Sequence, residues 1–182
     1  MPVLTKRLAA IEEADAGLVS PDAYRAAMRF VPAAVTIITA RHGGTRNGLT
    51  ATAVVSVSAD PPQLLICVNR EASAEPLIAA SGRFAVNLLA PAHQESADRF
   101  AQSKLSSDER FEAHCWIDLP SGMPALADAV ATFECRIVQH SRLGSHSLFI
   151  GEVVGIRTAP GEPLLYHAGR YRQLADLPQD RE

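Results

Sequence analysis

The stretch of sequence that decides the fold is Asn47-Gly48-Leu49-Thr50-Ala51-Thr52-Ala53-Val54-Val55-Ser56-Val57-Ser58-Ala59-Asp60-Pro61-Pro62. It predicts one β-strand that ends at a Pro-Pro turn. Because side chains alternate between the faces of a strand, four small hydroxyl groups share one face: Thr50, Thr52, Ser56 and Ser58. The other face, which we expect to meet a core, carries Ala51, Ala53, Val55 and Val57. Such a strand can let a flat, hydrogen-bonding ligand lie against its backbone, although a half-exposed strand that only meets water has the same pattern.

Length and composition limit the class of protein. The chain has 182 residues, 47% hydrophobic and 20% charged, which suits one globular domain. A net charge of −3 argues against a nucleic-acid partner. The cysteines, Cys67, Cys115 and Cys135, are odd in number and form no CxxC pair, which favours a reducing compartment without disulfides. No apolar run has the length of a signal sequence or a membrane span, so we expect a cytoplasmic protein without a membrane partner.

Strands outnumber helices in the predicted secondary structure. Ser20-Pro21-Asp22 predicts a helix start, with serine at the N-cap, and the helix is expected to run to about residue 30. Further helices are predicted at residues 73–80, with Ser73 as N-cap and Gly82 as the stop, and at residues 91–102. Residues 103–125 are predicted as a long irregular loop. The other strands are expected at residues 35–39, 63–69, 84–88, 132–140, 147–157, 164–167 and 171–174, with a hairpin corner at Gly169-Arg170.

This order of elements predicts a mainly β fold, a β-barrel with flanking helices. Neither a GxGxxG nor a GxxxxGK[ST] sequence occurs, so neither a Rossmann fold nor a P-loop is supported. The six histidines form no HxH or HExxH pattern, Cys67 and Cys135 lie in apolar strands, and no GxSxG is present. We therefore expect no metal site, no cysteine nucleophile and no serine hydrolase.

Two groups of polar residues leave alternatives open. His146 follows Gly144-Ser145 between two predicted strands, where a loop histidine can hydrogen-bond a ligand or simply face solvent. Cations and hydroxyl groups that could bind a phosphate come from separate segments: Arg70, Ser73, Arg99, Ser103 and Lys104. Taken alone, these side chains are also explained as solvated surface residues.

Short motifs follow one another in a fixed order along most of the chain. Besides the opening stretch, they are Val35-Thr36-Ile37-Ile38-Thr39, Cys67-Val68-Asn69, Gly82-Arg83-Phe84-Ala85-Val86-Asn87-Leu88-Leu89, Gly144-Ser145-His146 and Gly169-Arg170-Tyr171. By their order and spacing, the chain from Tyr24 to Leu174 resembles the short flavin reductases, whose domain is an FMN-binding split barrel. The resemblance implies a flavin reductase-like domain at residues 20–175, between an N-terminal extension at residues 1–19 and a C-terminal tail at residues 176–182.

The resemblance implies an NAD(P)H:flavin oxidoreductase that transfers hydride from NADH to FMN or FAD. It also implies a homodimer, and a partner monooxygenase that receives the reduced flavin. The flavin-binding residues that it implies are Thr50, Ala51, Thr52, Ser56, Val68, Asn69, Arg70, Ser73 and Lys104. It implies nicotinamide contacts from His146 and Tyr171. Because hydride passes directly between two cofactors, such an enzyme needs no general base, which agrees with the lack of an acid–base pair in the sequence.

Three departures from the family pattern leave the choice of cofactor open. The chain has Ala33-Ala34-Val35 in place of Thr-Gly-Val, Ala53-Val54 in place of Ser-Phe, and Ser145 in place of an acid before the turn histidine. The pattern therefore does not choose between FMN and FAD; family habit favours NADH over NADPH. Two alternatives stay open: a non-catalytic flavin-binding split barrel, and a related FMN-dependent split-barrel oxidase.

Overall fold

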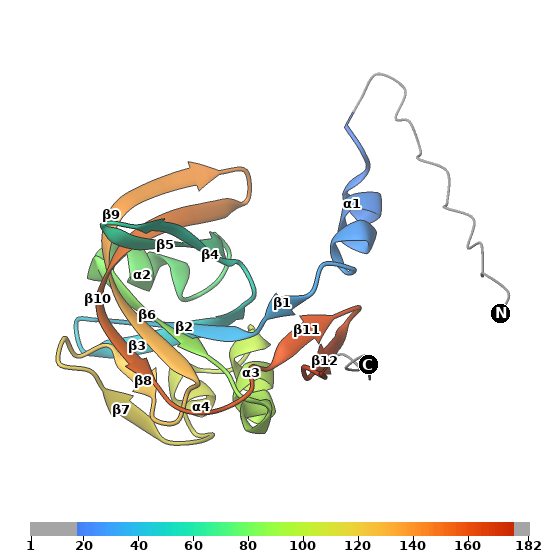
Figure 1. Cartoon of the computed structure of the whole chain (residues 1–182). Helices are drawn as coiled ribbons and strands as arrows, with labels where there is room; N and C mark the ends of the chain where they lie inside the picture. The colour runs from blue at the N-terminus through green and yellow to red at the C-terminus, as the bar shows by residue number, and fades with distance from the viewer. Residues whose placement is uncertain (1–17, 177–182) are drawn as a thin grey trace, which may run out of the picture.

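The computed structural model describes residues 18–176, so most of the predicted N-terminal extension and C-terminal tail lies outside the described residues. Its centre is a seven-stranded antiparallel sheet in the order β3-β2-β6-β9-β10-β5-β4 (Figure 1). The strands are β2 (Thr36–His42), β3 (Thr45–Ala51), β4 (Val54–Ala59), β5 (Pro62–Asn69), β6 (Arg83–Leu88), β9 (Ala131–Leu143) and β10 (His146–Thr158). The mainly β fold is thus confirmed.

The two edge strands of this sheet, β3 and β4, are neighbours in the sequence. Only Thr52 and Ala53 separate them, and a link of this length spans at most about 11 Å. Seven strands laid flat would place the two edges about 29 Å apart. The sheet must therefore roll up until its edges meet, and because β3 and β4 do not pair with each other, the barrel stays split along that line.

The prediction of one continuous strand over the opening stretch is wrong. The chain leaves β2 at the end of β3 and joins β5 on the other side of the split, and the Ala53 carbonyl accepts a hydrogen bond from the Cys67 amide at 3.1 Å. The link resets the alternation of side chains, so Val54 packs against the core while Val55 and Val57 are 57% and 48% exposed. The expectation that these two valines face a core is therefore also wrong.

Two large apolar clusters fill most of the molecule, and a third, smaller one surrounds Ala85 and Met123. One of the large clusters occupies the barrel, where Phe84, Cys135 and Phe149 are fully buried, and the other lies beneath α3 (Gln94–Ala101) around Phe100 and Phe111. Burial, with the nearby charge of Glu134, raises the pKa of the Cys135 thiol to about 12. Cys135 is thus the inert core residue that its apolar strand predicts, because a thiol is reactive only as the thiolate.

The helices largely follow the predicted positions. α1 (Pro21–Met28) is capped by the Ser20 hydroxyl, which accepts a hydrogen bond from the Ala23 amide at 3.1 Å, and α2 (Glu75–Ser81) ends at left-handed Gly82. Ser73 does not cap α2, because Ala74 holds the N-cap position. The prediction of an irregular loop at residues 103–125 is wrong. This segment contains α4 (Ser107–Arg110), β7 (Trp116–Asp118) and the start of β8 (Pro124–Leu126), which pairs with β7. A 3-10 turn, η1 (Pro91–His93), precedes α3.

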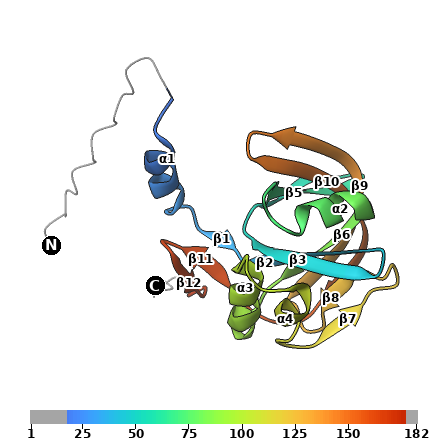
Figure 2. The same ribbon diagram turned by 180° about the vertical axis from the view of Figure 1, so that it is seen from behind.

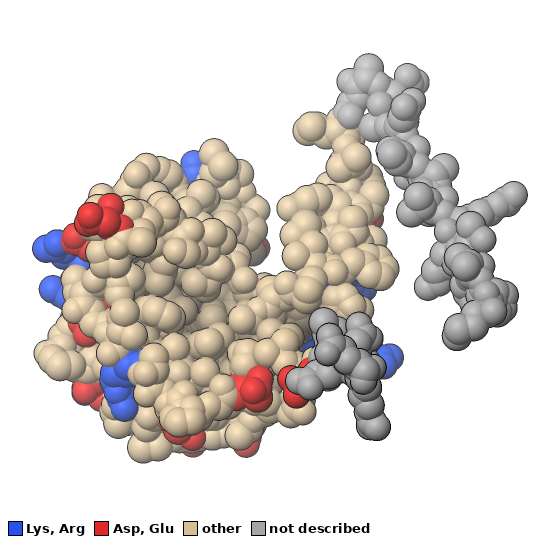
Figure 3. Space-filling model, viewed as in Figure 1, with Lys and Arg blue, Asp and Glu red and all other residues tan. Residues whose placement is uncertain are grey.

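A second, small sheet stands beside the barrel. It contains β1 (Ala33–Ala34), β11 (Leu165–His167) and β12 (Arg170–Arg172), and its hairpin turns at Ala168-Gly169, one residue before the predicted corner. β1 leads back to α1, which stands away from the barrel in both views of the ribbon (Figures 1 and 2) and buries no side chain. The space-filling view shows an open gap between this arm and the barrel (Figure 3). Within residues 18–176, no helix has the length and apolar character needed to cross a membrane.

Candidate functional site

A cleft of about 420 Å³, here called the tyrosine cleft, opens where β3 ends at the split. Its lining is Val35, Thr50, Ala51, Thr52, Asp98, Ala101, Tyr166, Gly169, Arg170 and Tyr171. The structure therefore brings the predicted flavin strand, Thr50-Ala51-Thr52, and the predicted nicotinamide residue Tyr171 to one cavity. The rings of Tyr166 and Tyr171, which both line the cleft, meet edge to face with their centroids 5.6 Å apart.

The tyrosine cleft is held open by two hydrogen bonds to α3. Tyr171 donates its hydroxyl to Asp98 Oδ1 at 2.8 Å, and Thr50 donates to the Ala97 carbonyl at 2.6 Å. Burial raises the pKa of Tyr171, and the hydrogen bond and charge of Asp98 raise it further. Thr52 is exposed in the cleft and forms no side-chain hydrogen bond to another described residue, so its hydroxyl is available to a ligand.

A smaller cavity of about 200 Å³, the Arg110 cleft, adjoins the tyrosine cleft and shares Thr50 and Ala101 with it. Its lining is Gly48, Leu49, Thr50, Glu71, Ala72, Ser73, Ala74, Phe100, Ala101, Gln102, Ser103 and Arg110. Gly48 lets β3 pass close beneath α3, because a Cβ atom there would lie 2.6 Å from the Ile38 carbonyl oxygen and 2.8 Å from the Phe100 ring. Gly48 thus makes room for the neighbouring strand and for the Phe100 ring, whereas the sequence pattern suggested room for a ligand against the strand backbone.

Arg110 places a positive charge in this cleft and forms no ion pair within residues 18–176, since the one carboxylate in the lining, Glu71, is exposed and does not reach it. The side chain is 4% exposed and donates to Asn47 Oδ1 at 2.7 Å, Ser73 Oγ at 2.9 Å and the Gln102 carbonyl at 2.7 Å. All three acceptors are neutral, the buried Nε atom has no hydrogen-bond partner among residues 18–176, and burial lowers the pKa of the guanidinium. A buried cation without a carboxylate is costly unless an anion binds beside it, so the cleft suits a phosphate group.

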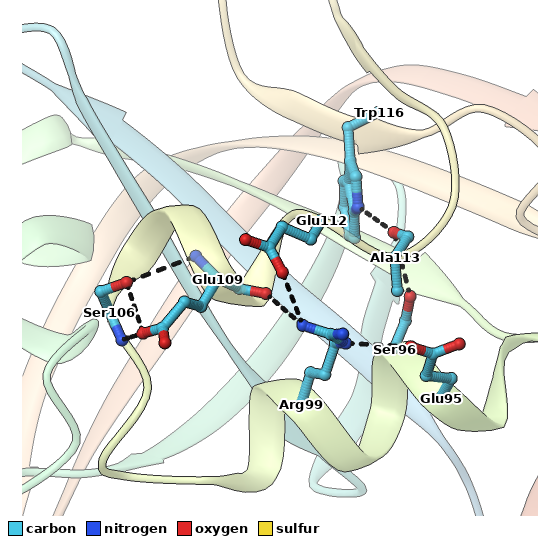
Figure 4. Close-up of polar contacts among 8 residues, drawn as sticks. All are labelled: Glu95, Ser96, Arg99, Ser106, Glu109, Glu112, Ala113 and Trp116. Carbon is cyan, nitrogen blue, oxygen red and sulfur yellow. Dashed lines mark hydrogen bonds and ion pairs between the residues drawn. The ribbon is translucent and has the colours of Figure 1, made fainter.

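The wall that carries Arg110 is fixed by polar contacts between α3 and the α4 region (Figure 4). Arg99 on α3 donates to the Glu109 carbonyl at 2.8 Å and to Glu112 Oε2 at 3.2 Å. Ser106 caps α4 and donates from its backbone and hydroxyl to the Glu109 carboxylate, which holds the pKa of Glu109 below its usual value. Arg99, a candidate phosphate residue in the sequence, is thus occupied by these contacts.

The other predicted flavin residues are spread around the clefts. Ser73 lines the Arg110 cleft, whereas Lys104 and Arg70 do not line it or the tyrosine cleft. Val68 is fully buried in the barrel, and Asn69 accepts a hydrogen bond from the Glu71 amide at 3.0 Å, which shapes the loop that leads to Ser73. Ser56 lies exposed on β4, across the split.

The Gly144-Ser145-His146 turn lies against the loop that follows β5. His146 begins β10 opposite Asn69, and its Nδ1 atom lies 2.9 Å from the Ser145 hydroxyl. Arg70 holds the turn, since its backbone amide donates to the Ser145 carbonyl at 3.0 Å and its guanidinium to the Gly144 carbonyl at 3.2 Å. His146 lines neither the tyrosine cleft nor the Arg110 cleft.

Sequence reasoning missed Arg110. The Ser106 and Glu109 capping box indicates a short helix that ends at this residue, so a local signal for its position exists. Its burial, however, depends on contacts with Asn47 and Ser73, which come from distant segments.

A larger hollow, of about 610 Å³, lies elsewhere, on the outer face of β6, β9 and β10. Its charged residues include Arg83 and Glu134, which pair at 3.6 Å, and none of the predicted site residues line it. Of the two buried side-chain atoms without a hydrogen-bond partner in residues 18–176, Arg41 Nε and Arg110 Nε, neither is in this hollow. Size alone therefore does not locate the site.

A rolled antiparallel sheet that stays open between β3 and β4, with a cleft at that opening, defines this protein as a split barrel. The model of the flavin reductase like domain matches residues 28–175, and the chain belongs to this family. The resemblance noted from the sequence motifs is thus confirmed.

Individual relatives agree with this assignment. The chain is 38% identical over 179 residues to an FMN reductase (NADH) RutF of Ancylobacter novellus, which covers 95% of this chain and 98% of the relative. It is similar to the NADH:FAD oxidoreductase SgcE6 of Streptomyces globisporus C-1027, solved in complex with NAD and FAD fragments. The TM-score is 0.80 at 33% sequence identity, and the match covers 91% of this chain and 100% of SgcE6. It is also similar to BorF, the flavin reductase component of a bacterial two-component tryptophan halogenase. Here the TM-score is 0.80 at 28% sequence identity, and the match covers 87% of this chain and 100% of BorF.

Proposed function

We propose that this protein is a flavin reductase that transfers hydride from NADH to FMN or FAD and supplies the reduced flavin to a partner monooxygenase. The observation that carries the proposal is Arg110, a buried cation that pairs with no carboxylate in the described part of the chain. Its cleft adjoins the one lined by Thr50-Ala51-Thr52. A flavin mononucleotide has a flat ring and a phosphate at its other end, and the two adjoining clefts offer a place for each.

The residues present fit a flavin. Arg110 and Ser73 would hold the phosphate, and the Thr52 hydroxyl and the β3 backbone would face the ring. Tyr166 and Tyr171 line the same cleft, where Tyr171 would meet the nicotinamide that approaches the ring. Asn69 and Arg70 would keep the loop that carries Ser73 in place. The flavin and NADH supply the hydride chemistry themselves, so this chain needs only to bind and orient them.

His146 and Tyr171 are proposed to contact the nicotinamide nucleotide. Tyr171 supports this role because it lines the tyrosine cleft. For His146 the support is its place in the fold. Arg70 holds the Gly144-Ser145 turn that precedes His146 against the loop after β5, and that loop leads to the Arg110 cleft. BorF, a reductase component of a two-component halogenase, supports a partner that receives the reduced flavin. The cytoplasmic location inferred from the cysteine pattern stays a prediction.

We also propose that two copies of the chain form a homodimer through the α1 arm. The eight-residue helix α1 buries no side chain, and isolated helices of this length are marginal in water. Three large apolar residues of this arm, which comprises α1 and the residues leading to β1, are exposed: Tyr24 is 57% exposed, Met28 46% and Phe30 72%. The β4 edge exposes Val55 and Val57, so one chain offers two apolar surfaces that a two-fold dimer can pair.

Light scattering after gel filtration tests the dimer. The wild type is expected to have the mass of two chains, and the double variant Tyr24→Ser, Phe30→Ser the mass of one. Ile156→Ser is a matched control, since Ile156 is 60% exposed but lies outside the arm. A single-chain mass for the wild type would refute the homodimer.

Oxidation of NADH, followed at 340 nm in air, tests the main proposal. Turnover by the purified protein is expected to depend on added FMN or FAD and to saturate with it. If the protein binds flavin but turns over neither NADH nor NADPH, the proposal is wrong and a flavin-binding role without catalysis replaces it.

A further inference from the structure

A further cavity, of about 410 Å³, lies beside the turn that precedes His146. It is lined by Arg70, Glu71, Glu75, Arg142 and Ser145, and we call it the Arg142 cleft. Glu71 lines both this cavity and the Arg110 cleft, so the two adjoin. We propose that the Arg142 cleft binds an adenosine phosphate group, the part that FAD and NADH have in common.

The positive charges of the cleft are available to a phosphate. Within residues 18–176, neither Arg70 nor Arg142 forms an ion pair with a carboxylate. Arg70 is nevertheless ordered, because it donates to the Gly144 carbonyl at 3.2 Å. Arginine presents several N–H donors in one plane, which suits two phosphate oxygens at once.

The carboxylates of the cleft suit the ribose. Glu75 is only 5% exposed, and its Oε1 atom accepts a hydrogen bond from the Ser147 hydroxyl at 2.5 Å, so its position is fixed. Its neighbour Glu71 is exposed at the boundary between the two clefts. An acidic side chain can accept hydrogen bonds from ribose hydroxyls, and it repels the 2′-phosphate that distinguishes NADPH from NADH. A cleft with both arginines and glutamates thus fits an adenosine phosphate better than an inorganic anion.

The order of the clefts indicates how the group would arrive, an inference that rests on the proposed function. With the flavin ring in the tyrosine cleft and its phosphate beside Arg110, the next cavity along the chain of clefts is the Arg142 cleft. The AMP half of FAD would extend into it. The AMP half of NADH would reach the same cavity past the His146 turn.

Flavin titrations with the full chain test the proposal and separate the two sources. If the Arg142 cleft binds the AMP half of FAD, Arg142→Ala is expected to weaken FAD binding about tenfold relative to FMN binding. Fluorescence quenching measures both affinities. If the cleft binds the AMP half of NADH instead, the ratio of FAD to FMN affinity stays that of the wild type. The KM for NADH, measured with FMN as acceptor, then rises about tenfold. Arg142→Lys is expected to restore part of the loss.

The matched control is Arg136→Ala. Arg136 lies on the same strand, is exposed and pairs with Glu152, and it lines none of the three clefts. The inference is wrong if Arg142→Ala and Arg136→Ala have the same ratio of FAD to FMN affinity and the same KM for NADH. Because flavin affinity is measured without turnover, and the wild type is assayed for NADH oxidation separately, this failure is distinguishable from failure of the proposed function.

Discussion

The two edges of the rolled sheet come from one stretch of sequence, yet they differ in what covers them. The β3 edge lies beneath α3, where Gly48 is buried and Thr50 is hydrogen-bonded to a helix carbonyl. The β4 edge packs mainly against β5 and leaves Val55 and Val57 exposed. A covered edge with polar gaps suits a small ligand, whereas a bare apolar edge suits another protein surface.

The largest expected effect comes from filling the space beneath the covered edge. Gly48→Ala would drive a Cβ atom against the Ile38 carbonyl and the Phe100 ring, and we expect it to lower the free energy of unfolding by about 2–3 kcal/mol. Urea denaturation measures this loss. Gly161→Ala is the control, because the nearest atom to its Cβ would be a Val130 methyl at 3.4 Å. Equal stability of the two variants would show that β3 is not held tightly against α3.

The next effect concerns the charge at the covered edge. Arg110→Gln removes the cation that the phosphate would meet, so FMN is expected to bind about 30-fold more weakly, a loss of about 2 kcal/mol. Riboflavin has no phosphate and is expected to bind nearly as it does to the wild type. Fluorescence titrations with both flavins give the two affinities. A parallel loss for riboflavin would mean that Arg110 only supports the local structure.

A direct comparison of the two edges follows from hydroxyl residues on each. Thr52→Val keeps the side-chain shape in the tyrosine cleft but removes one hydrogen-bonding group, and we expect flavin binding to weaken about fivefold. Ser56→Ala on β4 is expected to have the smaller effect, since Ser56 lines neither the tyrosine cleft nor the Arg110 cleft. If Ser56→Ala weakens flavin binding more than Thr52→Val does, the flavin lies on the β4 side of the split.

The smallest effect depends on pH. Tyr171→Phe loses the hydrogen bond to Asp98, and because Asp98 is exposed we expect a cost of about 0.5 kcal/mol. The pKa of Tyr171 is raised in the folded protein, so its contribution is fully present below the ordinary tyrosine pKa of about 10 and is lost as the pH rises further. Urea denaturation of both proteins at pH 7, 9 and 10.5 checks this. A stability difference that grows above pH 10 would contradict the assignment.

The sequence predicts single elements of this fold well and their ends less well. The β-branched run at residues 35–39 and the glycine after α2 are local signals, and each appears where it is expected. The split at Thr52-Ala53 has only a weak local signal. The apolar run Ala53-Val54-Val55 interrupts the alternation of polar and apolar residues, but such a run also occurs within continuous strands. Only the pairing of β3 with β2 and of β4 with β5 separates the two strands.

The site shows the same division. Thr50-Ala51-Thr52 and Tyr171 share a cleft as the motif resemblance implies. The cations that the sequence offered for a phosphate were Arg70, Arg99 and Lys104, whereas the cation that lines the Arg110 cleft is a different arginine. A surface arginine and a buried one look alike in a sequence, since burial is decided by residues that fold over the side chain.

The strand order also bears on how the chain folds as it is synthesised. β9 and β10 emerge late, yet they lie at the centre of the sheet and join β6 on one side to β5 on the other. Until they arrive, β5 and β6 each present an unpaired edge, which invites association with other chains. A nascent chain that stops before β9 therefore has two half-sheets and no barrel, and its protection by chaperones matters most in that interval.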